Sequence, residues 1–206
     1  MNPVRVGVLV SGGGSNLQAL LDAQKTGSLK SGRVALVISD NPSAYALTRA
    51  KKAGVPALAL DKKALGREGL EREIAQALET HGIELIVLAG FLTILSPDFT
   101  RAYAGRIINV HPSLIPAFCG EGFYGLKVHE AALARGVKIT GATVHFVDEV
   151  PDGGPIILQK AVRVLPGDSP ETLQRRVMEE AEWVILPQAV EQICQERISH
   201  VSEQTL

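Results

Sequence analysis

Residues 4–16 read VRVGVLVSGGGSN, and this stretch decides the fold. The apolar, Val-rich run at its start is typical of a buried strand. Three glycines follow, and the chain then enters a segment in which Leu17, Leu20 and Leu21 fall on one helical face. A strand, a glycine turn and a helix in direct succession predict the first unit of an α/β fold.

The same alternation continues along the chain. Further strands are predicted at 33–40, 55–60, 83–91 and 106–110. The segments between them have helical features: Gly54 is expected just past a helix end, a long helix is expected over about 66–81, and Ser96 and Pro97 are expected to start another. Near-continuous apolar strands alternating with helices indicate a parallel sheet covered on both faces.

The pattern changes in the last third of the chain. After an irregular segment at 112–124 and a helix at 125–135, two β-like runs flank the loop 148–154 and predict antiparallel edge strands. A closing helix is expected over about 169–197. We therefore expect a single domain over residues 1–206 with an open, Rossmann-like α/β sheet, mostly parallel, with antiparallel edge strands and helices on both faces.

Composition narrows the functional classes. The chain has 206 residues, 46% of them hydrophobic, which is enough for one sizeable core. Its net charge of −1 gives no basic field for nucleic acid or an anionic membrane. Cys119 and Cys194 are too few for a disulfide framework or a zinc cluster. The first apolar run is typical of a strand rather than a signal peptide. We expect a cytoplasmic protein that acts on small molecules without a metal.

The glycine-rich turn is the first candidate binding site. Backbone N–H groups in such a turn, together with the helix N-terminus, favour an anion. The alternative is a tight turn with Ser15 as the helix cap. A dinucleotide site is disfavoured because the third glycine position of G-x-G-x-x-G is Leu17. A single phosphate fits better. Asp40, at the end of the second strand, suits either a ribose contact or a turn.

A second candidate site lies in IINVHPS, residues 107–113. Asn109 and His111 are two residues apart, so in an extended segment they project from the same face. Pro112 biases His111 toward extended geometry. An amide donor and an imidazole on one face of a strand can polarise a carbonyl and move a proton. The alternative is a histidine that is simply hydrogen-bonded at a strand end.

A carboxylate that would orient the imidazole is sought in DEVPDGGP, residues 148–155. Spacing does not choose between Asp148, Glu149 and Asp152, and the segment also suits a hairpin-like loop. Among the other histidines, His145 is expected to make a hydrogen bond at the edge of the core. His129 is expected on a helix surface.

Four segments together resemble a known family: VLVSGGGSNLQALL, VLAGFLTILSP, IINVHPSLIPAF and GATVHFVDEVPDGGPIILQ. The chain is similar to the phosphoribosylglycinamide formyltransferases of the folate-dependent formyltransferase superfamily, over nearly its whole length. The N-x-H-P-S-L-x-P motif and the later D-G-G-P are shared by the superfamily, and the glycine loop narrows the resemblance to this branch. The resemblance implies a ribonucleotide-binding half over about 1–100 and a folate-binding, catalytic half over about 101–206.

The resemblance also implies roles for individual residues. The implied catalytic residues are Asn109, His111 and Asp152. The implied contacts to glycinamide ribonucleotide are Gly12, Gly13, Gly14, Ser15, Asn16 and Glu182. The implied folate contacts are Arg67, Leu92, Thr93, Ile94, Leu95, Asn109, Val147 and Asp148. Two departures stand out: the segment 117–132 differs from the family's shorter loop, and the stretch between Val177 and Pro187 is one residue longer, with Trp183 at a common His position.

The activity that the resemblance implies is transfer of a formyl group from 10-formyltetrahydrofolate to the amine of glycinamide ribonucleotide, as a monomer or homodimer. In this reaction Asn109 and His111 would stabilise the oxyanion. His111 would also carry a proton, and Asp152 would orient the His111 ring. Two alternatives stay open. A 10-formyltetrahydrofolate hydrolase would use the same three residues, and a Rossmann module could bind a nucleotide without catalysis.

Overall fold

The structure is a computed structural model that describes residues 2–203. Seven strands form one sheet: β1 (Val4–Val10), β2 (Gly32–Ser39), β3 (Ala57–Ala59), β4 (Leu85–Leu88), β5 (Ile107–His111), β6 (Ile139–Phe146) and β7 (Ile156–Arg163). The helices are α1 (Ser15–Thr26), α2 (Tyr45–Lys52), α3 (Lys62–Thr80), α4 (Pro97–Ala102), α5 (Leu126–Arg135), α6 (Pro170–Val177), the π-helix η1 (Met178–Glu182) and α7 (Trp183–Glu203).

The sheet order is β3-β2-β1-β4-β5-β6-β7. The first five strands pair in parallel, whereas β6 pairs antiparallel with both β5 and β7. The predicted α/β class, with a mostly parallel sheet and antiparallel strands at one edge, is confirmed. Strand order reverses at β1, which lies between β2 and β4, and such a switch point is where open α/β sheets bind ligands.

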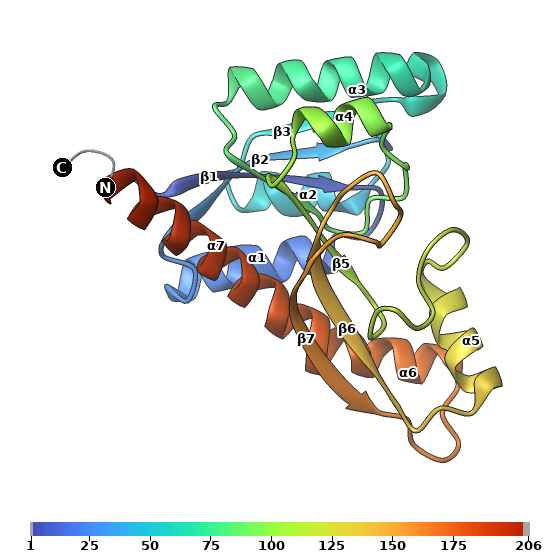
Figure 1. The fold of residues 1–206 in the computed structure, drawn as a ribbon. Coiled ribbons are helices and arrows are strands. Elements are labelled where there is room, and N and C mark those ends of the chain that lie inside the picture. Colours follow the sequence, from blue (N-terminus) through green and yellow to red (C-terminus); the bar gives the residue numbers. More distant parts are fainter. Residues whose placement is uncertain (1, 204–206) are drawn as a thin grey trace.

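Helices cover both faces of the sheet (Figure 1). In β1, Val6, Val8 and Val10 face one core, which includes buried side chains of α1, α2, α6 and α7. Leu9 faces the other core, which α3 and α4 complete. The predicted helical face of Leu17, Leu20 and Leu21 is confirmed, because all three are buried in α1. The alternating burial explains why the strand sequence is apolar almost throughout.

Helix ends follow the chemistry of their caps, with two departures from the predicted bounds. Ser96 caps α4 by accepting a hydrogen bond from the Phe99 N–H at 3.2 Å, as predicted. The helix α3 starts earlier than predicted because Asp61 caps it, and Gly66 (φ 65°) introduces a kink where the sequence suggested a start. The predicted closing helix is divided by η1.

No helix within residues 2–203 is long and apolar enough to cross a membrane. Cys119 and Cys194 are both free thiols. Cys194 is buried in the core between the sheet and α7.

Candidate active site

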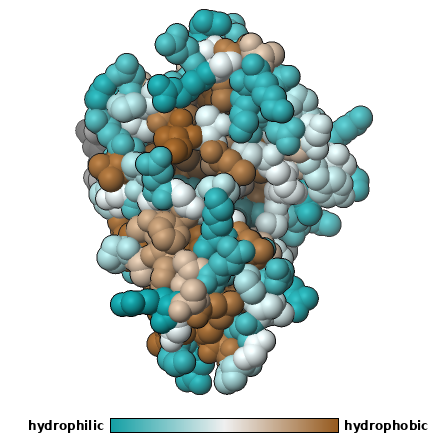
Figure 2. All heavy atoms as spheres, turned by 90° about the vertical axis from the view of Figure 1, so that its right-hand side faces the viewer, coloured by the Kyte–Doolittle hydropathy of each residue, from teal (hydrophilic) through white to brown (hydrophobic). Residues whose placement is uncertain are grey.

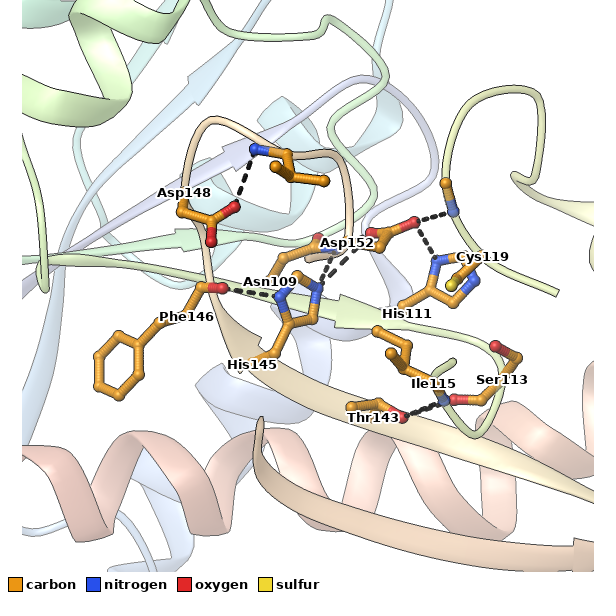
Figure 3. Close-up of polar contacts among 12 residues, drawn as sticks. Asn109, His111, Ser113, Ile115, Cys119, Thr143, His145, Phe146, Asp148 and Asp152 are labelled. Atoms are coloured by element: carbon orange, nitrogen blue, oxygen red, sulfur yellow. Dashed lines mark hydrogen bonds and ion pairs between the residues drawn. The ribbon is translucent and has the colours of Figure 1, made fainter. Parts of the chain in front are cut away.

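The predicted catalytic residues lie where parallel and antiparallel parts of the sheet meet (Figure 3). Asn109 and His111 belong to β5, and their side chains share one face of the strand, as the spacing predicts. His111 is 4% exposed, whereas Asn109 is half-buried. The strand ends at His111 and Pro112 follows, so the pair lies on the rim of the sheet.

Asp152 reaches this pair from the loop between β6 and β7. Its Oδ2 atom lies 3.4 Å from His111 Nδ1, and its Oδ1 atom lies 3.4 Å from Asn109 Nδ2. The backbone of Asp152 has φ 56°, a left-handed conformation that is uncommon for a residue other than glycine. The following glycines allow the tight loop: a Cβ on Gly154 would lie 2.0 Å from the Phe146 carbonyl oxygen. Of the three acids considered from sequence, Asp152 is the one in contact with His111.

His111 is held between two hydrogen-bond acceptors. Its Nε2 atom lies 2.9 Å from the carbonyl oxygen of Phe118, opposite the Asp152 contact at Nδ1. The backbone N–H of Gly120 donates to Asp152 Oδ2 at 2.8 Å. The irregular segment after β5 therefore contacts both His111 and Asp152. A ring with acceptors at both nitrogens has both contacts satisfied only when it is protonated.

His145 is the buried, hydrogen-bonded histidine that the sequence predicts, and it also belongs to this cluster, which the sequence did not indicate. It is buried, as a core-edge residue would be, but its Nε2 atom lies 3.2 Å from Asn109 Nδ2 and 3.5 Å from Asp152 Oδ1. Its Nδ1 lies 2.7 Å from the Phe146 carbonyl oxygen, so the Nε2 edge of the ring faces Asn109 and Asp152. The signal that could have found it is strand register, because Asn109 pairs directly with His145.

The electrostatics of the cluster favour a charged carboxylate beside a ring that gives up its proton readily. Burial acts to raise the pKa of Asp152, but the hydrogen bond to His145, the charge of His111 and the Gly120 N–H together hold that pKa below its ordinary value. Burial lowers the pKa of His111 below its ordinary value, against the opposing effects of Asp152 and the Phe118 carbonyl. The His111 ring is therefore poised to release a proton.

A cavity of about 140 Å³ opens beside the cluster. Asn109, His145 and Asp152 line it, and its other walls come from the β4–α4 connection and the loop after β6. Those walls include all the predicted folate contacts except Arg67, namely Leu92, Thr93, Ile94, Leu95, Val147 and Asp148. Figure 2 shows apolar surface gathered around the middle of this side of the molecule. A larger hollow of about 710 Å³ between α1 and α7 contains none of the catalytic cluster.

The glycine loop follows β1, at the switch point of the sheet. Gly14 (φ 73°) precedes α1, and a Cβ there would lie 2.7 Å from Ala46 Cβ, so only glycine fits. The carbonyls of Gly12 and Gly13 accept from Ala46 N–H and from Arg49. Gly12 and Gly13 are themselves exposed. The loop therefore combines open backbone with a helix N-terminus, as an anion site requires.

Asn16 and Glu182 form a buried pair next to this loop. Asn16 Nδ2 donates to Glu182 Oε2 at 2.7 Å. Burial raises the pKa of Glu182 to about 7, against the effect of the Asn16 hydrogen bond. Glu182 is the last residue of η1, and π-turns are frequent at functional sites. The extra residue expected between Val177 and Pro187 coincides with this π-turn, which widens the helix locally.

Some predicted residues lie apart from the cavity. Arg67 is exposed on α3 and does not line it. Asp40 is 1% exposed and accepts from Thr93 Oγ1 at 2.6 Å, so it supports a wall of the cavity. The expectation of a surface position for His129 is wrong: it is fully buried in α5, which packs against α6. Within residues 2–203 no group of three His, Cys, Asp or Glu side chains is arranged to hold a metal ion.

Comparison with known proteins gives the family. The chain matches the formyl transferase family over residues 4–190. It is 43% identical over 201 residues to the trifunctional purine biosynthetic protein adenosine-3 of Drosophila pseudoobscura pseudoobscura, covering 97% of this chain and 14% of that protein. It is 39% identical over 196 residues to the chloroplastic phosphoribosylglycinamide formyltransferase of Arabidopsis thaliana, covering 94% and 66%. It thus spans less than two thirds of the length of both curated relatives.

Solved structures agree. The crystal structure of glycinamide ribonucleotide transformylase 1 from Symbiobacterium toebii has a TM-score of 0.87 and 45% sequence identity, covering 95% of this chain and 89% of that one. Sequence and fold are therefore similar over the whole sheet and its helices. The chain belongs to the formyl transferase family, and it groups there with the phosphoribosylglycinamide formyltransferases.

Proposed function

We propose that this protein transfers the formyl group of 10-formyltetrahydrofolate to the amine of glycinamide ribonucleotide in de novo purine biosynthesis. The products are formylglycinamide ribonucleotide and tetrahydrofolate. The observation that carries the proposal is the cluster of Asn109, His111 and Asp152 beside a cavity with apolar walls. A glycine loop with anion-binding geometry lies at the neighbouring switch point of the sheet.

The formyl donor fits the cavity chemically. A folate has a flat ring with a polar edge, and this cavity combines aliphatic walls with a few polar groups, as small-molecule sites generally do. Leu92 and Ile94 are 57% and 60% exposed, which leaves apolar surface for a bound ligand to cover. Asp148 lies in the loop after β6, where it can meet ring nitrogens. Arg67 is exposed on α3 and would meet a carboxylate at the distal end of the donor.

The acceptor binds through its phosphate and its ribose. The backbone of Gly12, Gly13 and Gly14 and the start of α1 at Ser15 would bind the phosphate. Glu182, which Asn16 holds at 2.7 Å, would accept hydrogen bonds from the ribose or the glycinamide amine. Binding both reactants in one site supplies the entropic advantage of proximity.

The reaction is a direct transfer. The amine attacks the formyl carbon, and negative charge develops on the formyl oxygen. Asn109 Nδ2 then exchanges its 3.4 Å contact to Asp152 for a bond to this oxyanion, and protonated His111 assists. A preorganised donor of this kind contributes roughly 3–4 kcal/mol to lowering the barrier. The tetrahedral intermediate collapses as the bond from carbon to the folate nitrogen breaks.

One proton must pass from the attacking amine to the departing folate nitrogen. His111 carries it, directly or through a water molecule, once Nε2 exchanges its 2.9 Å contact to the Phe118 carbonyl for the reactants, and its lowered pKa favours release of the proton. Asp152 orients the ring and stabilises the imidazolium that forms. The low pKa of Asp152 keeps it ionised throughout the cycle.

Release of tetrahydrofolate with and without glycinamide ribonucleotide tests the proposal. We expect release only when the phosphorylated amine is present. Release in its absence, at the same rate, would identify a hydrolase. No release under either condition would identify a module that binds without catalysis, and both of these results would overturn the proposal.

A further inference from the structure

The segment that follows β5 makes hydrogen bonds both within itself and to side chains of β6 and β7. It supplies the Phe118 carbonyl to His111 and the Gly120 N–H to Asp152. Phe118 has φ 51°, which is unfavourable for a side chain of this size. Such a conformation persists only when the surroundings fix it. The groups that fix this segment therefore determine where its contacts to His111 and Asp152 lie.

The hydroxyl of Thr143 is the centre of those fixing contacts. Its Oγ1 donates to the Ser113 carbonyl at 2.7 Å and accepts from the Ile115 N–H at 3.1 Å. Thr143 is fully buried in β6. Figure 3 shows its side chain lying against the start of the segment, below the His111 ring. A single buried hydroxyl thus binds the backbone of the segment at two points.

Gln159, in β7, extends this set of contacts to a further strand. Its Nε2 donates to Thr143 Oγ1 and to the Ile115 carbonyl, both at 3.0 Å. The strand register explains why the groups meet. His111 pairs with Thr143 across β5 and β6, and Thr143 pairs with Gln159 across β6 and β7. Directly paired residues project to the same face of a sheet, so the three side chains form one row.

We propose that Thr143 and Gln159 are positioning residues for the formyl transfer. They hold the 113–120 segment so that it orients His111 and Asp152, without touching the reactants. The inference rests on the proposed roles of His111 and Asp152. It extends the catalytic machinery into the antiparallel edge of the sheet, which otherwise contributes His145 to the cluster and Asp152 from the loop after β6.

The test compares Thr143→Val, which removes the hydroxyl but keeps the shape, with Thr143→Ser, which keeps the hydroxyl. A displacement of about 1 Å in a catalytic group can cost roughly 10²-fold in rate. We expect Thr143→Val to lower kcat by ~10-fold to ~10²-fold, with KM for both substrates within about threefold. Thr143→Ser should retain most of the activity. Gln159→Met should lower kcat less, because the Thr143 hydroxyl remains.

A matched control lies on the same strand. Thr140 is 2% exposed, and its Oγ1 has no hydrogen-bond partner among the described residues. Thr140→Val therefore removes an equally buried hydroxyl outside the row, and kcat should stay at the wild-type value. Melting temperatures of all four variants separate loss of folding from loss of position. Because Gln159 is exposed on β7, Gln159→Met provides a variant that should fold.

The His111 ring gives a readout that loss of stability would not change. Burial is the main cause of its lowered pKa. If the segment loosens in Thr143→Val, water reaches the ring, and its pKa measured by nitrogen NMR should rise toward 6.5. An unchanged kcat and an unchanged His111 titration in Thr143→Val would overturn the inference. An inactive His111→Ala beside an active Thr143→Val would refute only this inference, whereas an active His111→Ala would refute the proposed function.

Discussion

The carboxylates of Asp152 and Glu182 have different surroundings. Asp152 accepts from the Gly120 N–H and lies beside His111, His145 and Asn109. Glu182 is 6% exposed, and among the described residues its carboxylate accepts a hydrogen bond from the Asn16 amide. The pKa of Asp152 is accordingly lowered, while the pKa of Glu182 is raised to about 7. Burial alone raises the pKa of a carboxylate, and partners placed around it reverse the effect.

The difference separates two tasks. Asp152 remains an anion at neutral pH and can stabilise a charged imidazole during proton transfer. Glu182 is about half protonated near pH 7, so it can either donate or accept a hydrogen bond toward a bound ligand. The first group suits catalysis and the second suits binding.

Replacing Asp152 with Asn tests the first task and carries the largest expected effect. The amide keeps the size of the side chain but cannot stabilise the imidazolium, so kcat should fall by ~10²-fold or more. Steady-state kinetics with both substrates measures the change. Asp22→Asn, an exposed carboxylate on α1, is the control and should leave kcat unchanged. If kcat survives in Asp152→Asn with the geometry intact, the orienting role is wrong.

Replacing Glu182 with Gln tests the second carboxylate by its effect on the free energy of unfolding at different pH values. Its folded pKa of about 7 lies above the ordinary 4.5. The wild-type free energy of unfolding therefore includes a contribution that is complete below pH 4.5 and is lost as pH rises through 7. The loss is roughly 3 kcal/mol, from about 1.4 kcal/mol per pKa unit. Urea denaturation should show Glu182→Gln more stable than wild type at pH 8 and similar at pH 4.5. A stability difference independent of pH would contradict the account.

His129 extends the comparison to a buried base. It is fully buried, its ring nitrogens have no hydrogen-bond partner among the described residues, and burial lowers its pKa to about 4. The pKa of His129 in the folded protein lies below the ordinary 6.5. Its contribution to the free energy of unfolding is therefore fully present above pH 6.5 and is lost as the pH falls through 4. The wild type should lose up to roughly 3 kcal/mol over this range. His129→Leu should remove that loss, as acid titration followed by circular dichroism would reveal; equal acid sensitivity of both proteins would refute this.

The glycine loop gives the smallest expected effect on stability. Gly14→Ala places a Cβ 2.7 Å from Ala46 Cβ at φ 73°, which should cost ~1–2 kcal/mol in thermal unfolding. Gly13→Ala is the matched control, because a Cβ there meets no described heavy atom within 4 Å. It should melt like the wild type and yet bind the ribonucleotide more weakly. Equal melting temperatures for the two variants would show that Gly14 is not required by the fold.

Much of the fold follows from local patterns. The period of Leu17, Leu20 and Leu21 predicts the buried face of α1, and the apolar runs predict the parallel strands. The pairing of Asn109 and His111 on one face needs only the period of a strand. Local patterns also gave two errors: the cap at Asp61 starts α3 before the apolar period does, and packing of α5 against α6 buries a histidine that the helical period assigned to the surface.

The rest of the site depends on distant contacts. That Asp152 is the acid beside His111 depends on a left-handed backbone conformation within its loop. The place of His145 depends on the β5–β6 register, and that of Thr143 depends on the same register two residues along. None of these is encoded in the spacing of a single segment. The family resemblance pointed to Asp152 as the third catalytic residue. The fold supplies the physical reason that Asp152 reaches His111.

The fate of the formyl carbon distinguishes transfer to the amine from hydrolysis. The donor carries a ¹³C label in its formyl group, and the products are separated after reaction with glycinamide ribonucleotide. We expect the label to appear in formylglycinamide ribonucleotide in equal amount to the tetrahydrofolate released, and we expect His111→Ala and Asp152→Asn to slow both together. Label recovered as free formate, with the ribonucleotide unchanged, would contradict this expectation.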